Sequence, residues 1–565
     1  MGRTPGDIER ELAELASVDR QFGEEATSLA NAHRTATGRD AQPYKFPDAS
    51  VLARPVPHFV PARGWRRITW GLVRKFGPGV ATIRLRDGRT AFVPRGCVLA
   101  GNVEDLLDRF VGRSRTRLFF GNSVHYEESL HGALTHQLRP GWSPERLMWH
   151  CYVGEVLVAD KSTVKAAGGK RFLRGQSAHD RALRLSDAAE SVVRLDGLLY
   201  AMIGGERAAQ ADHAAVADHC VRTGVDAECS PDPMLGVVRV KRRAQLTDRV
   251  AVIIPTRGTS AHVLGSDRVL VEGAIRSLLR CTSRVQLEFI VVADSETPSA
   301  ARAALANIPG ADIRIIDYDR PFNFAEKVNI GALSTDAEFL LLMNDDVEVV
   351  ADGTIETLLG YFHDESVGQV APVLRFEDGT VQSAGHLLNP APFDLYRGYP
   401  PDLRGGDSML HAARDVSSVI AAFTLIRSQY FHEVGGMCPQ FPRDYNDVDC
   451  SLKLAMSGRR TIITPLVHCL HFESKTRIAV QEIESVELLG RRWQHVLESD
   501  PHGNPFLAPF EFIWVPATGA GPDLDAALGV RSEWDSREWE LLNAREDRHL
   551  HRTRYFPKWV RLGTK

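Results

Sequence analysis

The chain has 565 residues, more than one ordinary hydrophobic core can organise, so about two to four domains are expected. Hydrophobic residues make up 44% of the sequence and charged residues 25%, which is typical of a soluble globular protein and excludes a disordered one. The formal net charge of -4 lacks the basic excess that nucleic acid binding would require, so no nucleic acid partner is expected.

The eight cysteines are scattered along the chain and never occur as Cys-x-x-Cys. This pattern signals neither a disulfide framework nor a zinc finger, and it fits a reducing cytoplasm. No apolar stretch reaches the roughly 18 residues that span a bilayer, and the N-terminus lacks the apolar segment of a signal peptide. We therefore expect a cytoplasmic protein.

The first segment, residues 1–45, contains an amphipathic helix pattern. Two heptads are too few to identify a coiled coil, so packing on the same chain and oligomerisation both remain open. Apolar side chains recur on one stripe with acids and bases elsewhere: Ile8, Leu12, Leu15, Val18 and Phe22.

Residues 46–235 open with a Pro-rich stretch that gives way to a β-like one. The sequence GVATIRLRDGRTAFVP holds two short strand patterns around an Asp-Gly turn at Asp87 and Gly88. A small β element is expected there.

From residue 248 the pattern changes to apolar runs that alternate with helical segments. Four runs have the length of buried strands: RVAVIIPTRG, QLEFIVVADSE, ADIRIIDYD and FLLLMNDDVEVV. Strands alternating with helices predict an α/β fold with a largely parallel sheet, whose ligands bind beyond the carboxyl ends of the strands. Those ends carry Pro255, Asp294, Asp319 and the pair Asp345 and Asp346, so one site is expected to contain them.

Seven short motifs follow one another through residues 248–510: VAVIIPTRG, FIVVADSE, RPFNFAEKVNIGA, FLLLMNDDVEV, DGTVQSAG, VGGMCPQFPRDYNDVDCSLKL and PLVHCLHFESKTR. In order and spacing the series resembles the family 2 glycosyltransferases, which are inverting nucleotide-sugar enzymes of the GT-A fold. The resemblance implies a catalytic GT-A domain at residues 248–485, a helical C-terminal extension at residues 486–565, and a nucleoside-diphosphate sugar as donor. It also implies a glycan or lipid-linked acceptor in the synthesis of a bacterial surface polysaccharide.

A divalent cation, Mn²⁺ or Mg²⁺, is part of this expectation. A hard cation takes oxygen ligands and would offset the repulsion between the neighbouring carboxylates Asp345 and Asp346. By resemblance Asp346 is the direct ligand, Asp345 lies beside it near the ribose or the metal, and His471 completes the metal site. The alternative reading of the residues is a helix N-cap, a role for which Asp352 is better placed than Asp346.

Asp447, in the stretch RDYNDVDCSLKL, is the expected general base. It precedes a predicted helix, from which it can reach the sugar pocket and accept the proton of the acceptor hydroxyl. Relatives usually have Glu-Asp where this chain has Asn446 and Asp447, a change that keeps the base but removes its acidic neighbour. Asp449 is the rival candidate, and its alternative role is that of an acid favoured by the helix dipole.

The remaining donor contacts are expected from strand ends, one helix and one loop. Relatives read VVDNGS where this chain reads VVADSE, so Asp294 is displaced by one position. Arg477 is suited to phosphate oxygens because its guanidinium is a planar fork, and a solvated loop residue is the alternative. The expected donor-binding residues are Pro255, Thr256, Arg257, Asp294, Lys327, Asn329, Asp345 and Arg477.

Residues 157–185 look like a diverged copy of residues 425–454. Because the position of the base holds alanine in the first segment, we expect residues 46–235 to form a degenerate GT-A-like domain with a structural or acceptor-binding role. The stretch RLFFGNSVHYEES resembles an acidic strand end without a clean pair. Matched positions are Gly168-Gly169 with Gly435-Gly436, Asp180 with Asp449, and Ala178 with Asp447.

The tail at residues 548–565 carries six basic residues and no acid, with aromatic side chains among them. This composition favours peripheral contact with an anionic membrane surface at the inner face of the cell membrane, and a solvated or packed tail is the alternative.

Taken together, the motifs predict a metal-dependent inverting glycosyltransferase. Two other classes remain open: a non-catalytic nucleotide-sugar or glycan-binding scaffold, and a sugar nucleotidyltransferase. The acidic pair, base and histidine argue against the first class. The absence of a Gly-rich phosphate loop argues against the second.

Overall fold

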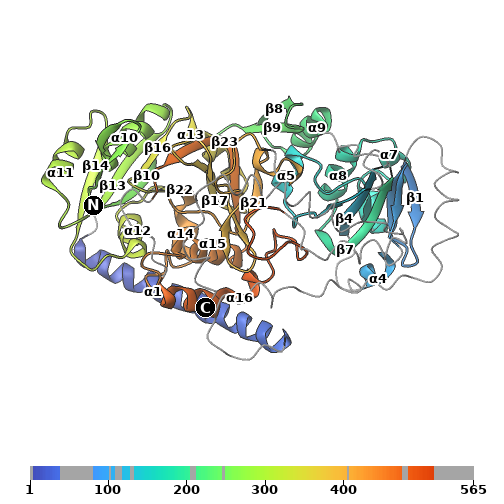
Figure 1. Cartoon of the computed structure of the whole chain (residues 1–565), viewed down its shortest axis with the longest axis horizontal. Coiled ribbons are helices and arrows are strands. Elements are labelled where there is room, and N and C mark those ends of the chain that lie inside the picture. The colour runs from blue at the N-terminus through green and yellow to red at the C-terminus, as the bar shows by residue number, and fades with distance from the viewer. Residues whose placement is uncertain are drawn as a thin grey trace.

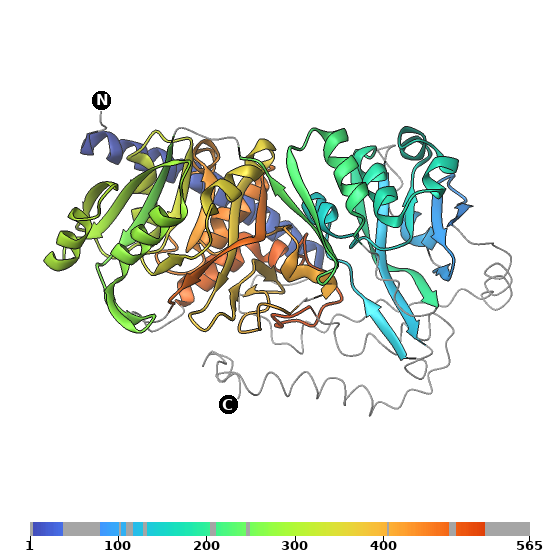
Figure 2. The same ribbon diagram turned by 90° about the horizontal axis from the view of Figure 1, so that it is seen from above.

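Two mixed sheets with their helices lie side by side along the long axis of the molecule (Figure 1, Figure 2). The ten-stranded sheet belongs to the second half of the chain, and the seven-stranded sheet belongs to the first half. Arg477 and the basic tail lie outside the described residues. The computed structural model describes residues 4–37, 80–100, 103–108, 117–127, 133–203, 211–244, 249–403, 406–473 and 482–514.

The four strands predicted from residue 248 onward are confirmed, but the sheet that contains them is mixed and not largely parallel. These four strands lie in the spatial order β14-β13-β10-β15, and all three neighbouring pairs are parallel. The chain builds outward from β10 on one side and then returns to place β15 on the other side. Ligands of such sheets bind beyond the strand ends at this reversal. The strands are β10 (Arg249–Thr256), β13 (Gln286–Asp294), β14 (Asp312–Tyr318) and β15 (Phe339–Met343).

Helices cover both faces of these strands because successive side chains of a strand point to opposite sides. Val252 packs into one core cluster with α10 (Leu270–Cys281), and Ile253 packs into another with α12 (Phe324–Leu333). The α12 backbone lies very close to β10, since a Cβ added at Gly331 would be 2.4 Å from Ile253 Cγ2. β10 and β15 are therefore enclosed on both faces, and their ends are the parts available for chemistry.

An antiparallel and mixed half completes this sheet. β15 pairs antiparallel with β22, β22 antiparallel with β17, β17 parallel with β23, and β23 antiparallel with β16. The alternative reading of Asp352 as the N-cap of α13 is wrong. The N-cap residue of α13 is Gly353, and no side chain forms a capping hydrogen bond with this helix. The elements are β16 (Val347–Val349), α13 (Thr354–Leu359), β17 (Val367–Arg375), β18 (Val381–Ser383), β21 (Arg414–Val416), β22 (Phe423–Arg427), α14 (Ser428–Glu433), α15 (Asn446–Met456) and β23 (Arg460–His471). We call residues 249–473 the second domain.

Shorter elements within the second domain connect its main strands. They form two hairpins, one helix and two 3-10 turns, one turn after α13 and the other before β21. They are β11 (Ser260–Val263), β12 (Ser266–Val269), α11 (Ser299–Ala306), η2 (Gly360–His363), β19 (His386–Leu388), β20 (Pro392–Asp394) and η3 (Gly406–His411).

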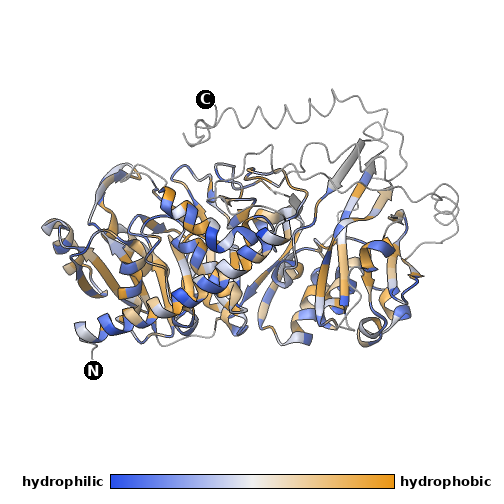
Figure 3. Cartoon of the chain, turned by 90° about the horizontal axis from the view of Figure 1, so that it is seen from below, coloured by the Kyte–Doolittle hydropathy of each residue, from blue (hydrophilic) through white to orange (hydrophobic). Residues whose placement is uncertain are grey.

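The predicted amphipathic helix is confirmed as α1 (Pro5–Thr37), and it packs on its own chain. It runs beside α16 (Ile483–Leu497) beneath the second domain (Figure 1), with many polar residues on the outward side (Figure 3). Its buried stripe includes one charge, Asp19, which contacts Lys453 Nζ at 2.7 Å and Arg492 at 3.2 Å. Small residues allow the close approach, since a Cβ at Gly23 would lie 2.8 Å from the Arg492 guanidinium.

The seven-stranded sheet has the order β1-β2-β6-β4-β7-β3, with β5 added beside β4. The predicted Asp-Gly hairpin is confirmed, because β1 and β2 pair antiparallel and Gly88 has a φ of 87°. We call residues 80–203 the N-terminal module. Its elements are β1 (Val80–Arg84), β2 (Thr90–Pro94), β3 (Cys97–Leu99), α4 (Val103–Asp108), β4 (Arg117–Glu127), β5 (Ala133–Gln137), α5 (Pro144–Trp149), β6 (Leu157–Ala159), α6 (Lys161–Ala166), α7 (Lys170–Arg174), α8 (Ala178–Asp187) and β7 (Ser191–Ile203), followed by α9 (His213–Thr223), β8 (Ala227–Asp232) and β9 (Val237–Arg242).

Strand pairing in the N-terminal module follows that of β17, β18, β22 and β23. β4 pairs parallel with β7 and antiparallel with β5 and β6, as β17 pairs parallel with β23 and antiparallel with β18 and β22. β4, the strand of the stretch RLFFGNSVHYEES, thus has the same pattern of parallel and antiparallel neighbours as β17.

Direct hydrogen bonds join the N-terminal module to the second domain. Ser143 Oγ donates to Asp415 Oδ2 at 2.5 Å and accepts from the Asp415 backbone N–H at 3.0 Å. Trp514 Nε1 donates to the Leu138 carbonyl at 2.9 Å. Across the described residues, none of the helices combines the length and apolarity that crossing a bilayer requires.

Candidate active site

The acidic pair lies at the carboxyl end of β15, where the backbone turns into β16. Register places Val347 of β16 opposite His471 of β23, and the Asp346 carbonyl accepts from the Phe472 N–H at 2.9 Å. His471 Nε2 consequently lies 3.1 Å from Asp346 Oδ1. Residues 125 positions apart in the sequence are thus brought together by one short antiparallel pairing.

The residues at this position fit a divalent cation. Asp346 and His471 supply an oxygen and a nitrogen donor, both of them protected from solvent. The Oδ1 atom of Asn344 is buried and has no hydrogen-bond partner among the described residues, although its Nδ2 lies 3.4 Å from His471 Nε2. A buried acceptor without a donor, next to a carboxylate and an imidazole, is what a cation site leaves when only the protein atoms are considered.

The pKa values of Asp345 and His471 are consistent with a cation site. Burial and the neighbouring Asp346 carboxylate raise the pKa of Asp345 to about 7. The pKa of His471 is also raised; burial opposes this, but the Asp346 carboxylate outweighs it. A positive charge placed between these groups would favour the ionised carboxylates and the neutral imidazole.

The donor-binding candidates after β10 and β13 form one connected group. Thr256 Oγ1 accepts from the Gly258 N–H at 2.9 Å and donates to Asp345 Oδ2 at 2.6 Å. Asp294 forms an ion pair with Lys327, whose Nζ also donates to the Thr256 carbonyl at 3.2 Å. Lys327 itself is completely buried, so it holds Asp294 and Thr256 in place and does not present its charge to the surface.

Other predicted donor contacts have different surroundings. Arg257 is exposed and lies 3.8 Å from Asp294, so it can reach a ligand beyond the strand end. Pro255 is buried inside the sheet opposite Val292. Asn329 does not join the group, because its amide donates to the Met437 carbonyl at 2.8 Å and accepts from the Met437 N–H at 2.9 Å.

Asp447 lies in the first turn of α15 and is partly exposed. Its carboxylate accepts from the Val448 N–H at 2.8 Å and from the Ala421 N–H at 3.3 Å. Burial raises the pKa of Asp447, an effect that the nearby His386 opposes and Asp394 reinforces. A carboxylate with a raised pKa can still accept a proton near neutral pH.

The rival base, Asp449, is fully buried and engaged elsewhere. Its Oδ1 accepts from Trp493 Nε1 at 2.9 Å and from Arg492 Nη1 at 3.0 Å, and its Oδ2 lies 3.5 Å from Lys453 Nζ. Asp449 therefore ties α15 to α16 and faces away from any open surface. The adjacent Asn446 is buried as well, and donates to the Phe441 carbonyl at 3.2 Å.

Sequence comparison decides the family. A model of glycosyl transferase family 2 matches residues 252–435. These residues form a family 2 glycosyltransferase domain. The mixed α/β sheet that contains them is the predicted GT-A fold, and we refer to the second domain below as the glycosyltransferase domain.

Two curated relatives extend the likeness beyond this domain. The O-antigen biosynthesis protein RfbC of Myxococcus xanthus is 29% identical over 447 residues, which cover 73% of this chain and 33% of RfbC. The uncharacterized protein y4gI of Sinorhizobium fredii is 26% identical over 410 residues, covering 66% of this chain and 43% of y4gI. The chain thus spans between a third and under half of the length of these relatives.

Solved structures give partial overlays. One is GalNAc-T7 with UDP, GalNAc and Mn²⁺, with 13% identity, a TM-score of 0.35, and coverage of 45% of this chain and 49% of that chain. Another is the mannosyltransferase PcManGT from Pyrobaculum calidifontis with GDP-Man and Mn²⁺, with 17% identity, a TM-score of 0.31, and coverage of 55% and 84%.

Gln382, Glu473 and Arg397 form a hydrogen-bonded chain that supports His471. The sequence motifs did not predict a role for these three residues. His471 Nδ1 lies 2.8 Å from Gln382 Oε1, and Gln382 Nε2 donates to Glu473 Oε2 at 3.0 Å. Glu473 in turn accepts from Arg397 Nη2 at 2.5 Å. Gln382 lies in the motif DGTVQSAG and Glu473 in the motif PLVHCLHFESKTR, so both belong to stretches that the resemblance had singled out. Their contact joins segments that are 91 residues apart, so only the fold shows it.

Proposed function

We propose that this chain is a metal-dependent inverting glycosyltransferase that moves a sugar from a nucleoside-diphosphate donor to a hydroxyl of a glycan or lipid-linked acceptor. The observation that carries the proposal is that two consecutive residues, Ala421 and Ala422, link Asp447 to Asn344 through backbone hydrogen bonds. The Ala421 N–H donates to Asp447 at 3.3 Å, and the Ala422 carbonyl accepts from the Asn344 N–H at 2.8 Å, beside the acidic pair. The candidate base and the candidate cation ligands therefore flank one short backbone segment.

Asp447 acts as general base in this proposal. Its carboxylate takes the proton of the acceptor hydroxyl while the hydroxyl oxygen bonds to the anomeric carbon and the bond to the diphosphate breaks. One in-line displacement inverts the anomeric centre. The Ala421 N–H, the Val448 N–H and the start of α15 hold the carboxylate in place throughout.

The donor nucleotide binds beyond the ends of β10, β13 and β15. Thr256 orients Asp345 toward the ribose or the cation, and Lys327 fixes Asp294 for the base of the nucleotide. Arg257 is the exposed group that contacts the donor directly. Arg477 is proposed as a phosphate contact from its sequence motif.

Asp346 and His471 would hold Mn²⁺ or Mg²⁺, with Asn344 and Asp345 beside them. When bound, such a cation supplies neutralisation of the charge that develops on the leaving diphosphate. The support is the donor set itself, together with the buried Asn344 oxygen that lacks a partner.

We also propose that the N-terminal module is a degenerate copy of the part of the domain that contains β17, β22 and β23. Its support is the shared pairing order, together with an ion pair at the same spacing on the matched helices. Arg184 Nε lies 2.9 Å from Asp180 on α8, and Lys453 Nζ lies 3.5 Å from Asp449 on α15. Ala178 stands at the position matched to Asp447, so each chain would have one active centre.

The acceptor is proposed to be a bacterial surface polysaccharide or its lipid-linked precursor. The support is the name of RfbC, an O-antigen biosynthesis protein, which shares 29% identity over 73% of this chain. Peripheral attachment of the tail at residues 548–565 to the inner face of the cell membrane belongs to the same proposal and rests on its basic and aromatic composition.

A thermal-shift screen of nucleoside-diphosphate sugars with and without Mn²⁺ tests the proposal. At least one donor should raise the melting temperature of wild type when Mn²⁺ is present, and D346A should abolish the increase. D352N is the control, because Asp352 lies on the same strand-to-helix connection without contacting His471. A screen in which no donor stabilises wild type, and D346A behaves identically, would contradict the proposal.

A further inference from the structure

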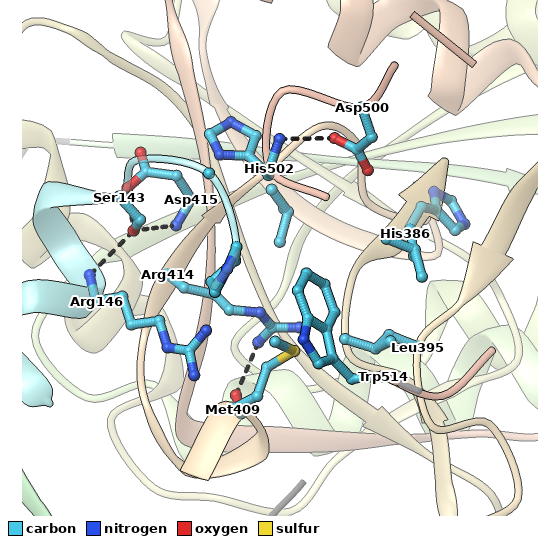
Figure 4. A pocket seen from close by; sticks show the side chains of 14 residues that line it. Ser143, Arg146, His386, Leu395, Met409, Arg414, Asp415, Asp500, His502 and Trp514 are labelled. Atoms are coloured by element: carbon cyan, nitrogen blue, oxygen red, sulfur yellow. Dashed lines mark hydrogen bonds between the residues drawn. The ribbon is translucent and has the colours of Figure 1, made fainter. Parts of the chain in front are cut away.

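A small pocket of about 30 Å³ lies where the N-terminal module, the glycosyltransferase domain and the segment after α16 meet. Its walls include Arg146 from the module, His386 and Arg414 from the domain, and His502 and Trp514 from the last described segment (Figure 4). A volume of this size has room for a group of a few non-hydrogen atoms, such as a carboxylate. None of the donor-site candidates lines it, so the pocket is separate from the expected donor site.

The pocket carries a buried positive charge that has no acid of its own. Arg414 is 6% exposed, and among the described residues no carboxylate lies within ion-pair distance of it. Its guanidinium donates instead to the carbonyls of Met409, at 3.1 Å, and Ala384. Burying an ion without a counter-ion is costly, and a bound anion would remove that cost.

Arg146 brings a second guanidinium to the same side of the pocket (Figure 4). It is 1% exposed and lies over the ring of Tyr152, 4.9 Å from the centroid. Burial, reinforced by repulsion from Arg146, lowers the pKa of Arg414 to about 9. Two buried guanidinium groups that repel each other favour a shared anion, since each can donate in a planar fork.

The acids that line the pocket are already occupied. Asp415 pairs with Arg460 Nε at 2.6 Å and accepts from Ser143 Oγ. Asp500 accepts from the Leu388 N–H at 2.9 Å, from Ser417 Oγ at 2.5 Å, and from the His502 N–H at 2.8 Å. Neither carboxylate forms an ion pair with Arg414, so the acids that line the pocket do not compensate the charge of Arg414.

The pocket adjoins the candidate base through His386. This side chain lines the pocket, and its Nδ1 lies 2.8 Å from Ser418 Oγ. The same imidazole is close enough to Asp447 to influence its ionisation. Because Asp447 is the group that faces the acceptor hydroxyl, the pocket lies on the acceptor side of the site.

We propose that this pocket binds an anionic group of the acceptor, a carboxylate of an acidic sugar or a phosphate, between Arg146 and Arg414. The inference rests on the proposed function, which supplies the acceptor. It makes the junction with the N-terminal module part of the acceptor site, since Arg146 comes from the module and Arg414 from the glycosyltransferase domain.

The test measures anion binding to the full chain in EDTA, so that the metal-dependent donor site does not contribute. Melting temperatures are recorded against inorganic phosphate, glucuronate and neutral glucose, with ionic strength held constant by NaCl. Saturable stabilisation by glucuronate identifies the carboxylate source, and stabilisation by phosphate identifies the phosphate source; either result supports the pocket. Stabilisation of wild type by neither anion overturns it, whatever the donor screen shows.

Two substitutions locate the site. R414Q should weaken the apparent anion affinity at least about tenfold, because a charge-assisted hydrogen bond is lost. R181Q is the matched control: Arg181 is also buried without an ion pair among the described residues, and also donates to two carbonyls, those of Leu173 and Gln176, both at 3.2 Å, but it lies outside the pocket. R414K keeps the charge and serves if R414Q does not fold, with a smaller loss expected. Anion binding that is equal in all three folded variants overturns the proposal.

Discussion

The Nδ1 atom of His471 lies 2.8 Å from Oε1 of Gln382, and this contact decides which imidazole nitrogen faces the acidic pair. Gln382 Nε2 donates to Glu473, so its Oε1 is the atom that faces the ring and Nδ1 carries the hydrogen. Nε2 is left with its lone pair directed to the side of Asp346, the form in which histidine binds a metal.

Replacing Gln382 by leucine should therefore weaken Mn²⁺ binding by about 10–100-fold without removing a ligand. The reason is that Nδ1–H loses its acceptor and the ring can take the other tautomer. Mn²⁺ titration followed by the melting temperature gives the affinity. Q429L is the control, because Gln429 is exposed and bonds only Glu433 on its own helix. An unchanged affinity in Q382L would remove Gln382 from the site.

Mn²⁺ affinity of the wild type should also fall steeply in mild acid. The pKa of His471 is raised above its ordinary 6.5, so at pH below that raised value a proton occupies the nitrogen that the cation needs. The affinity measured at several pH values should decline as pH decreases through this range and be constant above it. If it is constant from pH 8 to pH 5, His471 is not a ligand.

The pH profile of kcat/KM should show an acid limb set by Asp447. Because burial raises the pKa of this carboxyl above its ordinary 3.8, the base becomes protonated, and the rate falls, at a higher pH than for an exposed aspartate. His386 opposes the shift, so H386A should move the limb to still higher pH. An acid limb at the ordinary value in both proteins would exclude Asp447 as the base.

Local sequence signals were enough to locate the strands and the acidic pair. Apolar runs that end in Thr256, Asp294 and Asp345 show both the buried strand and its polar end, because burial on both faces requires a continuous apolar stretch. The family motifs added His471, whose partner Asp346 is reached through β-pairing that no local pattern encodes.

Long-range polar contacts could not be predicted in the same way. Helical periodicity placed Asn329 with Lys327 on a nucleotide face, but the partner of Asn329 is the backbone of Met437, 108 residues later. The amphipathic pattern of the first helix predicts Asp19 on its polar side. Asp19 is buried because Lys453 and Arg492, 434 and 473 residues away, neutralise it. Such burial depends on tertiary partners and leaves no periodic signal.

Removal of the Asp19 charge should loosen the first helix. D19N leaves Lys453 and Arg492 buried with one carboxylate between them, which should cost about 3 kcal/mol in the free energy of unfolding. Urea denaturation measures the change. E14Q, at an exposed position of the same helix with no ion pair among the described residues, should leave stability unchanged. Equal stabilities for D19N and wild type would mean that the network contributes nothing.

The same network predicts a loss of stability in acid. In the folded protein the pKa of Asp19 is lowered; burial opposes this, and the charges of Lys453 and Arg492 outweigh it. A lowered folded-state pKa means that the contribution is fully present above the unfolded-state pKa of about 3.9 and disappears as pH falls through the lowered value. D19N should therefore show a weaker pH dependence than wild type below pH 4.

Glycosyl transfer can be measured through the nucleotide product when the donor identified by the screen is supplied with an acceptor glycan. We expect release of nucleoside diphosphate with Mn²⁺, a product glycoside of inverted anomeric configuration, and a rate at least about 100-fold lower for D447N. D352N should react like wild type. Release of pyrophosphate, or a D447N rate equal to that of wild type, would contradict the proposed inverting transfer with Asp447 as base.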